Sequence, residues 1–242
     1  MIRFYAPDIQ ECLRLPIEEA RHCIRVLRHK TGDIIEVGDG KGSIYECRIV
    51  AITKDDVSLE IITSIECLKP WKGTISVAVA PPKNVERIEW MVEKITEIGV
   101  DSIIPVRCAR SERKDLRIDR IEKIVISSMK QALQPSVPLL HSMLSFSDLM
   151  IMTRDYDGKY IAFCGEDSDK KELADVINTE SNCVILIGPE GDFTENEVAT
   201  AKQYGYVPVA LGSSRLRTET AAIVAADTFH IVQSLRKNNS DN

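Results

Sequence analysis

Two loops rich in glycine and charged residues stand where the ligand-binding loops of a parallel sheet are expected. The first, GPEG at 188–191, directly follows the apolar run VILI at 184–187. The second, LGSSRLRTETA at 211–221, follows the short run VPVA at 207–210. Ligands of open parallel sheets bind beyond the carboxyl ends of the strands. We therefore expect the two loops to form one ligand site.

The residue types in the first loop favour a neutral or cationic ligand over a phosphate. The chain lacks the G-x-x-x-x-G-K-[ST] and G-x-G-x-x-G patterns that bind phosphates. The carboxylate of Glu190 would repel a phosphate, while the glycines let the backbone approach a flat ring closely. S-adenosylmethionine, with an adenine ring and a positive sulfonium, meets both demands. The alternative interpretation is a tight strand-to-helix turn that carries a surface glutamate.

The second loop places Arg215, Arg217 and Glu219 between a strand end and an alanine-rich helix. Thr218 or Thr220 could simply cap that helix. The helix sequence at 221–226, however, predicts close packing, and this puts the arginines beside a buried boundary. Because arginine is rarely buried without a partner, their position indicates a function.

Composition describes an ordinary globular protein of 242 residues, with 44% hydrophobic and 28% charged residues and a formal net charge of −6. Its longest apolar runs are far too short to cross a membrane, and its N-terminus has no apolar signal region, so we expect a cytoplasmic protein without a membrane partner. The seven cysteines are dispersed without C-x-x-C pairs. This spacing argues against disulfides and against a metal site.

Two stretches are locally basic despite the negative net charge. Residues 21–30 hold four Arg or Lys and no acid, and residues 107–123 hold seven Arg or Lys against four acids. Such clusters can neutralise nucleic-acid phosphates. They can equally be solvated helix faces.

Two domains follow from the order of the expected elements. Residues 1–70 read as short strands that suit a small antiparallel barrel, and residues 73–236 alternate strands and helices, which predicts an α/β domain with a mostly parallel sheet. The last residues, 237–242, are expected to fray. The first domain should hold strands at 3–5, 34–38, 43–52 and 57–65 and a helix at 17–27. The second should hold strands at 74–80, 102–106, 160–164, 183–187 and 207–211 and helices at 84–99, 116–133, 170–177, 195–204 and 218–235.

The two loops together resemble a known family. The pattern IGPEG-D-F-x-x-x-E-V followed by LG-x-x-x-LRTETA is similar to the RsmE family of 16S ribosomal RNA uracil-N3 methyltransferases, within the SPOUT superfamily. RHCIRVLRHKTGD at 21–33 and KITEIG at 94–99 resemble its weaker signatures. Asp192 departs from the pattern, since a second glycine commonly follows GPEG there.

The resemblance implies a PUA-like RNA-binding barrel over 1–70, a trefoil-knotted SPOUT domain over 73–236, and a homodimer that acts on 16S rRNA of the 30S ribosomal subunit. It implies S-adenosyl-L-methionine as cofactor and no metal. The cofactor-binding residues implied are Ile187, Gly188, Pro189, Glu190, Gly191, Leu211, Gly212, Leu216, Arg217 and Thr218.

The charged residues of the two loops also receive expected roles in methyl transfer. Arg217 is the predicted stabiliser of negative charge on the uracil, with Arg215 or an arginine of a second copy as alternates. Glu219 and Glu190 are the candidates for a general base. The predicted RNA-binding residues are Arg21, Arg25 and Arg28, spaced i, i+4, i+7 on one helical face, with a second stripe of Arg110, Arg113 and Arg117.

Two rival functions remain open at this point. One is a ribose 2′-O methyltransferase of the same superfamily that acts on tRNA. The other is a non-catalytic RNA-binding protein with a dead cofactor pocket, which the intact LRTETA string disfavours.

Overall fold

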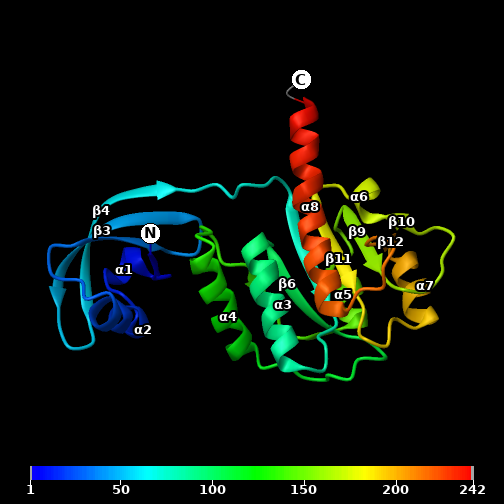
Figure 1. Cartoon of the computed structure of the whole chain (residues 1–242), viewed down its shortest axis with the longest axis horizontal. Helices are drawn as coiled ribbons and strands as arrows, with labels where there is room; N and C mark the ends of the chain where they lie inside the picture. Colours follow the sequence, from blue (N-terminus) through cyan, green and yellow to red (C-terminus); the bar gives the residue numbers. More distant parts are fainter. Residues whose placement is uncertain (1, 241–242) are drawn as a thin grey trace. The chain divides into compact units, whose positions relative to one another are not determined.

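The computed structural model describes residues 2–240, and the chain in it forms two compact units (Figure 1). The first unit comprises the residues up to Pro70 together with Ile126–Val137, and the second comprises the rest. Helix α4 (Ile118–Gln131) thus begins in the second unit and ends in the first. The functional domains at 1–70 and 73–236 stay a prediction.

The first unit is built on a four-stranded sheet in the order β1-β2-β3-β4. The long pairs β2–β3 and β3–β4 are antiparallel, as expected, but β1 pairs with β2 in parallel. The core beneath this sheet contains Phe4, Val37, Tyr45 and Ile49, all nearly inaccessible to solvent. The strands are β1 (Arg3–Tyr5), β2 (Ile34–Gly38), β3 (Ser43–Ile52) and β4 (Val57–Glu66).

The helix expected at 17–27 is shorter and less regular than its sequence suggests. A short α1 (Ile9–Cys12) precedes it, α2 (Ile17–Arg21) forms its first turn, and a π-helical turn, η1 (His22–Val26), forms the rest. The helix then ends, and Arg28 adopts a left-handed φ of 59°. The expected i, i+4, i+7 face of three arginines is therefore wrong, because Arg28 lies beyond the helix.

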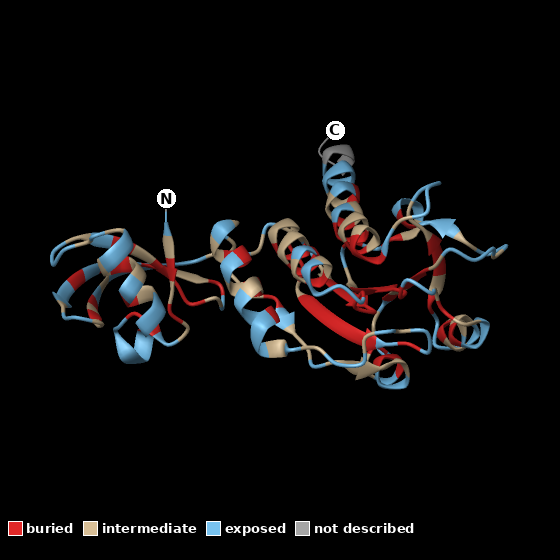
Figure 2. Cartoon of the chain, turned by 60° about the horizontal axis from the view of Figure 1, so that its bottom comes forward, coloured by how far each residue is buried: buried red, intermediate tan, exposed pale blue. Residues whose placement is uncertain are grey.

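The second unit contains an eight-stranded sheet whose paired strands are all parallel, which confirms the predicted α/β class. The order is β10-β12-β9-β11-β5-β6-β7, and β8 also pairs with β6. Figure 2 shows that buried residues gather in these strands. The strands are β5 (Thr74–Val79), β6 (Ser102–Arg107), β7 (Leu139–Leu140), β8 (Leu144–Ser145), β9 (Gly158–Ala162), β10 (Lys171–Glu172), β11 (Asn182–Ile187) and β12 (Val207–Ala210).

Most helices of this unit begin and end where their sequence predicts. Asn84 caps the first by accepting a hydrogen bond from the Glu86 N–H, and Gly99 ends it with a φ of 110°. The Thr194–Glu197 capping box starts another. The helices are α3 (Val85–Ile98), α4, α5 (Phe146–Met152), α6 (Leu173–Val176), α7 (Glu195–Gln203) and α8 (Thr218–Ser240).

Two expectations in this unit are wrong. Residues 170–177 form the edge strand β10 and the single turn α6 instead of one helix. Helix α8 continues through Lys237 to Ser240, where a frayed tail was expected, and residues 241–242 lie outside the described part.

The described cysteines are all free thiols. Burial raises the pKa of the Cys108 and Cys183 thiols to about 12, which keeps both protonated and unreactive at neutral pH. Between residues 2 and 240, the structure has neither a helix suited to spanning a membrane nor a cluster of side chains suited to a metal ion.

Candidate cofactor and active site

Three loops meet at the carboxyl edge of the parallel sheet and enclose a cavity of about 250 Å³. They follow β11, β12 and β9, which are neighbours in the sheet. We call this cavity the carboxyl-edge pocket. Its lining residues are Ala162, Phe163, Cys164, Ile187, Gly188, Pro189, Glu190, Asp192, Arg215, Leu216, Arg217, Thr218 and Ala221.

The structure brings together most of the residues expected to hold a cofactor, but not all of them. Gly191, Leu211 and Gly212 are outside the lining. The Gly212 N–H donates to the Glu172 carboxylate at 3.1 Å, and its φ of 95° favours glycine. The backbone geometry of the turn after β12 therefore explains Gly212 without a ligand contact.

Thr218 ties the two predicted loops together. Its hydroxyl donates to the Gly188 carbonyl oxygen at 3.0 Å, and the residue is only 5% exposed. Because Thr218 is also the first residue of α8, this bond joins the GPEG loop to the start of the helix. The Thr in LRTETA is thus a structural link between the two loops.

Glu219, the next residue, is not among the lining residues of the carboxyl-edge pocket. It is 5% exposed, and its Oε1 lies 3.6 Å from the Arg87 Nε on α3. Its Oε2 is buried with no hydrogen-bond partner among the described residues. Glu219 therefore has one obvious contact, a half-exposed arginine at the start of α3.

The GPEG loop is held by its own carboxylates. Glu190 accepts a hydrogen bond from the Lys83 N–H at 2.9 Å, which connects it to the loop after β5. Asp192 accepts from the N–H groups of Cys164 and Gly165 at 3.0 and 3.3 Å, which connects it to the loop after β9. Asp192 has a φ of 61°, a region that glycine adopts freely, and this explains why glycine is common at its position.

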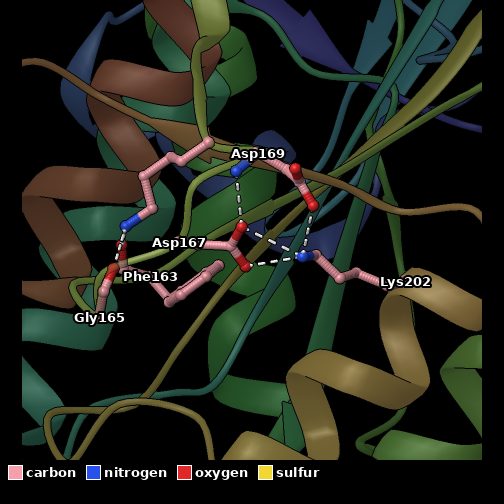
Figure 3. A network of polar contacts seen from close by, with 6 residues as sticks. Phe163, Gly165, Asp167, Asp169 and Lys202 are labelled. Atoms are coloured by element: carbon pink, nitrogen blue, oxygen red, sulfur yellow. Dashed lines mark hydrogen bonds and ion pairs between the residues drawn. The ribbon is translucent and has the colours of Figure 1, made fainter.

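The loop after β9 is a wall of the pocket that sequence reasoning missed. Lys170 donates to the carbonyl oxygens of Phe163, at 2.8 Å, and of Gly165, and its ammonium lies 4.2 Å from the centre of the Phe163 ring (Figure 3). Lys202 of α7 pairs with Asp167 and Asp169 of the same loop. The sequence predicted a strand at 160–164, but not that this strand pairs with the strand before the GPEG loop.

The Lys202–Asp167 pair is electrostatically favourable. The Lys202 ammonium, followed by the Asp169 N–H, holds the pKa of the Asp167 carboxyl below its ordinary value of 3.8. Asp167 and Asp169 in turn raise the pKa of Lys202. Both charges therefore persist at neutral pH and anchor the loop to α7.

The arginines divide into two groups by what they contact. Arg215 and Arg217 are exposed at the carboxyl-edge pocket, and their side chains have no hydrogen-bond or ion-pair partner among residues 2–240. Arg110 and Arg113 instead donate to backbone carbonyl oxygens of nearby loops. Arg117 pairs with Asp119 at 3.0 Å on the surface. The stripe expected from 110, 113 and 117 is thus not a set of free cations.

In the first unit, Arg21 and Arg25 do share a face. Both reach the same oxygen, the Asp55 Oδ1, at 3.1 and 2.9 Å, and both remain about half exposed. Arg28 does not join this pair. Two of the three arginines predicted to share this helical face therefore lie side by side, paired with one carboxylate.

Comparison with known proteins identifies the family. Residues 69–230 match the RNA methyltransferase domain, and residues 15–62 match the RNA methyltransferase PUA domain. The chain belongs to the RNA methyltransferase family. The PUA match falls on the small sheet of the first unit, and the methyltransferase match covers the parallel sheet and the carboxyl-edge pocket.

Solved and curated relatives agree with this assignment. A probable rRNA-methyltransferase from Porphyromonas gingivalis is 38% identical, with a TM-score of 0.93 over 98% of this chain and 100% of its own. Ribosomal RNA small subunit methyltransferase E from Neisseria gonorrhoeae, bound to S-adenosyl methionine, is 27% identical, with a TM-score of 0.83 over 97% and 98%. The enzyme of the same name from Bacillus subtilis is 29% identical to this chain, and the match covers 86% of this chain and 85% of the Bacillus enzyme.

These relatives confirm the resemblance to the RsmE family and the predicted fold class, a PUA-like domain followed by a SPOUT methyltransferase domain. The trefoil knot that the resemblance implies stays a prediction.

Proposed function

We propose that this RNA methyltransferase transfers a methyl group from S-adenosylmethionine to N3 of a uracil in 16S rRNA of the small ribosomal subunit. The observation that carries the proposal is the carboxyl-edge pocket. Its lining includes Arg215 and Arg217, whose side chains are unpaired, and the GPEG loop, which Thr218 joins to the start of α8. The names of the Neisseria and Bacillus relatives support the ribosomal substrate.

The residues of the carboxyl-edge pocket fit the proposed cofactor. Its apolar walls, such as Ile187, Pro189 and Leu216, suit an adenine ring. The carboxylates of Glu190 and Asp192 suit a positive sulfonium. The volume is slightly below the range of about 300–1,000 Å³ that is usual for small-molecule sites. When bound, the cofactor supplies an electrophilic methyl group.

Arg217 is the proposed catalytic residue. Uracil N3 carries a proton and becomes a good nucleophile only when that proton leaves, so negative charge develops on the uracil oxygens. The guanidinium of Arg217 is exposed, unpaired and at the pocket, where it can stabilise this charge. Arg215 two residues before it meets the same criteria and is the alternate. Holding N3 in line with the methyl group supplies a further part of the rate enhancement.

The two candidate bases differ in position. Glu190 lines the carboxyl-edge pocket, whereas Glu219 is buried against Arg87 outside it. We therefore propose that Glu219 is a positioning residue that orients Arg87 and the start of α8. Glu190 remains the carboxylate that can reach a proton in the pocket.

RNA docking is proposed for the first unit, through Arg21 and Arg25, whose shared Asp55 holds them side by side while leaving them about half exposed. The roles of Arg28, which lies off this face, and of Arg117 stay predictions.

A homodimer and a cytoplasmic location complete the proposal. Three large apolar side chains, Trp90 of α3 and Ile231 and Leu235 of α8, are 47%, 50% and 59% exposed on helices that pack against each other. A second copy would cover them. Sedimentation equilibrium should give twice the chain mass, and a monomer would contradict this part.

The decisive experiment for function is methylation of assembled 30S particles and of naked 16S RNA. The RNA is digested after the reaction, and mass spectrometry identifies the modified nucleoside. We expect 3-methyluridine. A 2′-O-methylated nucleoside, or methylation of tRNA instead, would identify the rival activity, and no transfer together with no cofactor binding would identify a non-catalytic RNA-binding protein.

A further inference from the structure

The segment between β6 and α4 carries two arginines that bind backbone groups instead of charged side chains. Arg110 Nη1 donates to the carbonyl oxygens of Gly191 and Phe193 at 3.0 and 3.2 Å. Arg113 donates through Nε to the Pro82 carbonyl oxygen at 3.2 Å, and through Nη2 to that of Lys83. Each guanidinium thus donates to two carbonyl groups of one loop, which are adjacent for Arg113 and two residues apart for Arg110.

Those two loops are already joined at the carboxyl-edge pocket by Glu190, which accepts the Lys83 N–H. The hydrogen bonds therefore form a closed ring. Arg113 binds the loop at 82–83, Lys83 of that loop binds Glu190 of the GPEG loop, and Gly191 of the GPEG loop binds Arg110, which lies on the same segment as Arg113. Asp192 stands in the sequence between the two residues whose carbonyl groups Arg110 binds. Its carboxylate accepts from the N–H groups of residues 164 and 165, so the same network also includes the loop after β9.

The arginine segment is itself anchored. The Ala109 N–H donates to the Glu197 carboxylate at 2.7 Å, and the same carboxylate completes the capping box of α7. The Cys108 N–H donates to the Ser111 hydroxyl at 2.9 Å. Arg110 and Arg113 therefore lie on a turn that is held by hydrogen bonds at residues 108 and 109. Surface arginines that only bind RNA phosphates do not need such a fixed backbone.

We propose that Arg110 and Arg113 are positioning residues of the cofactor site, which hold the loops at 82–83 and 191–193 in the geometry that binds S-adenosylmethionine. This replaces the sequence-based expectation that they contact RNA phosphates. The inference rests on the proposed function for the identity of the ligand. Hydrogen bonds from a charged donor to fixed carbonyl groups are among the stronger ones in proteins, so their loss loosens the loops in the free protein.

The test is calorimetric titration of S-adenosylmethionine into the full chain and its Arg110→Ala and Arg113→Ala variants. We expect each variant to raise Kd by about tenfold, which is the equivalent of about 1.4 kcal/mol. In methylation assays, KM for the cofactor should rise by a similar factor, while kcat at saturating cofactor and KM for RNA stay close to those of the unmodified protein. Arg→Lys variants should recover part of the affinity, because one ammonium can still reach one carbonyl oxygen.

Arg154→Ala is the matched control. Arg154 is exposed, lies before β9 and hence at the opposite edge of the sheet, and its side chain has no partner among residues 2–240. Its removal takes away the same charge and should leave the cofactor Kd unchanged.

RNA binding as a function of salt separates the two roles. Loss of phosphate contacts lowers the slope of log K against log salt by about 0.7–0.9 per contact. An unchanged cofactor Kd in the variants, with a lower salt slope, would overturn the inference in favour of RNA contacts. An equal Kd for the Ala and Lys variants would also overturn it. If the unmodified protein itself fails to bind the cofactor, the proposed function fails instead.

Discussion

The bond from Thr218 to Gly188 offers the sharpest single-atom test of how the two loops form one site. Thr218→Val replaces the hydroxyl by a methyl group of nearly the same size, so it removes the bond without opening a cavity. The bond is 3.0 Å long, and Thr218 is 5% exposed. The Gly188 carbonyl oxygen then loses this hydrogen bond in a place that water reaches poorly.

The magnitude follows from that burial. An unsatisfied buried acceptor costs about 1–3 kcal/mol, and the valine recovers part of this because no hydroxyl is buried any longer. We therefore expect the free energy of unfolding to fall by about 1–2 kcal/mol. In the free variant the two loops are no longer joined at this point. Restoring their arrangement on binding would raise the cofactor Kd by up to about tenfold, the equivalent of 1.4 kcal/mol.

Two matched variants isolate the hydroxyl. Thr218→Ser keeps the donor and should behave like the unmodified protein in both measurements. Thr220→Val makes the same chemical change two residues later, where the structure gives the hydroxyl no bond among residues 2–240. Denaturant unfolding and cofactor titration are the assays. Equal unfolding free energies and equal Kd values for Thr218→Val and Thr218→Ser would refute the reasoning.

Four further predictions concern the site and its supports. Arg217→Ala should keep the fold and the cofactor Kd within about threefold but lose at least about 100-fold in kcat, and near-normal turnover would remove Arg217 from the mechanism. Arg21→Glu with Arg25→Glu should weaken RNA binding and lower its salt slope, whereas an unchanged slope would contradict docking through this face. Glu219→Gln should lower kcat without altering its pH profile, because a positioning residue does not take the proton, and loss of the acid limb, along which a general base ionises, would make it the base. Asp167→Asn should lower the free energy of unfolding at pH 7, and this loss should disappear as the pH falls below 3.8, because the ion pair stabilises the fold only while the Asp167 carboxyl is ionised and its pKa in the fold is lowered. A loss of unfolding free energy that does not change with pH would exclude the ion pair.

The parallel sheet was predictable because its strands and helices alternate with clear periodicity. Capping residues placed several helix ends, as Asn84 and Gly99 show for α3. The location of the site followed from the rule that ligands bind at the carboxyl edge of such a sheet. Both predicted loops line the pocket for this reason.

The third wall of the pocket could not be predicted from local sequence. The loop after β9 lies beside the GPEG loop only because β9 and β11 are paired, and pairing between strands distant along the chain leaves no local pattern. The short edge strand β10 was missed for a similar reason, since a two-residue strand has no periodicity to detect.

The roles of the charged residues also depended on tertiary structure. Arg110 and Arg113 read as a basic stripe, yet both bind carbonyl groups of distant loops. Arg28 leaves the expected face because the π-helical turn η1 changes the residue spacing along the helix and because Arg28 itself adopts a left-handed φ of 59°. Nothing in the spacing of the arginines signals that turn. Spacing along a helix predicts which residues share a face only where the helix is regular.

A crystal structure of the protein with S-adenosylmethionine tests the central claim most directly. We predict the ligand to lie between the loop at 187–190 and the loop at 215–218, with its methyl group open to the side where Arg217 is exposed. Cofactor bound elsewhere on the chain, or a phosphate group in place of the nucleoside between these two loops, would contradict the account.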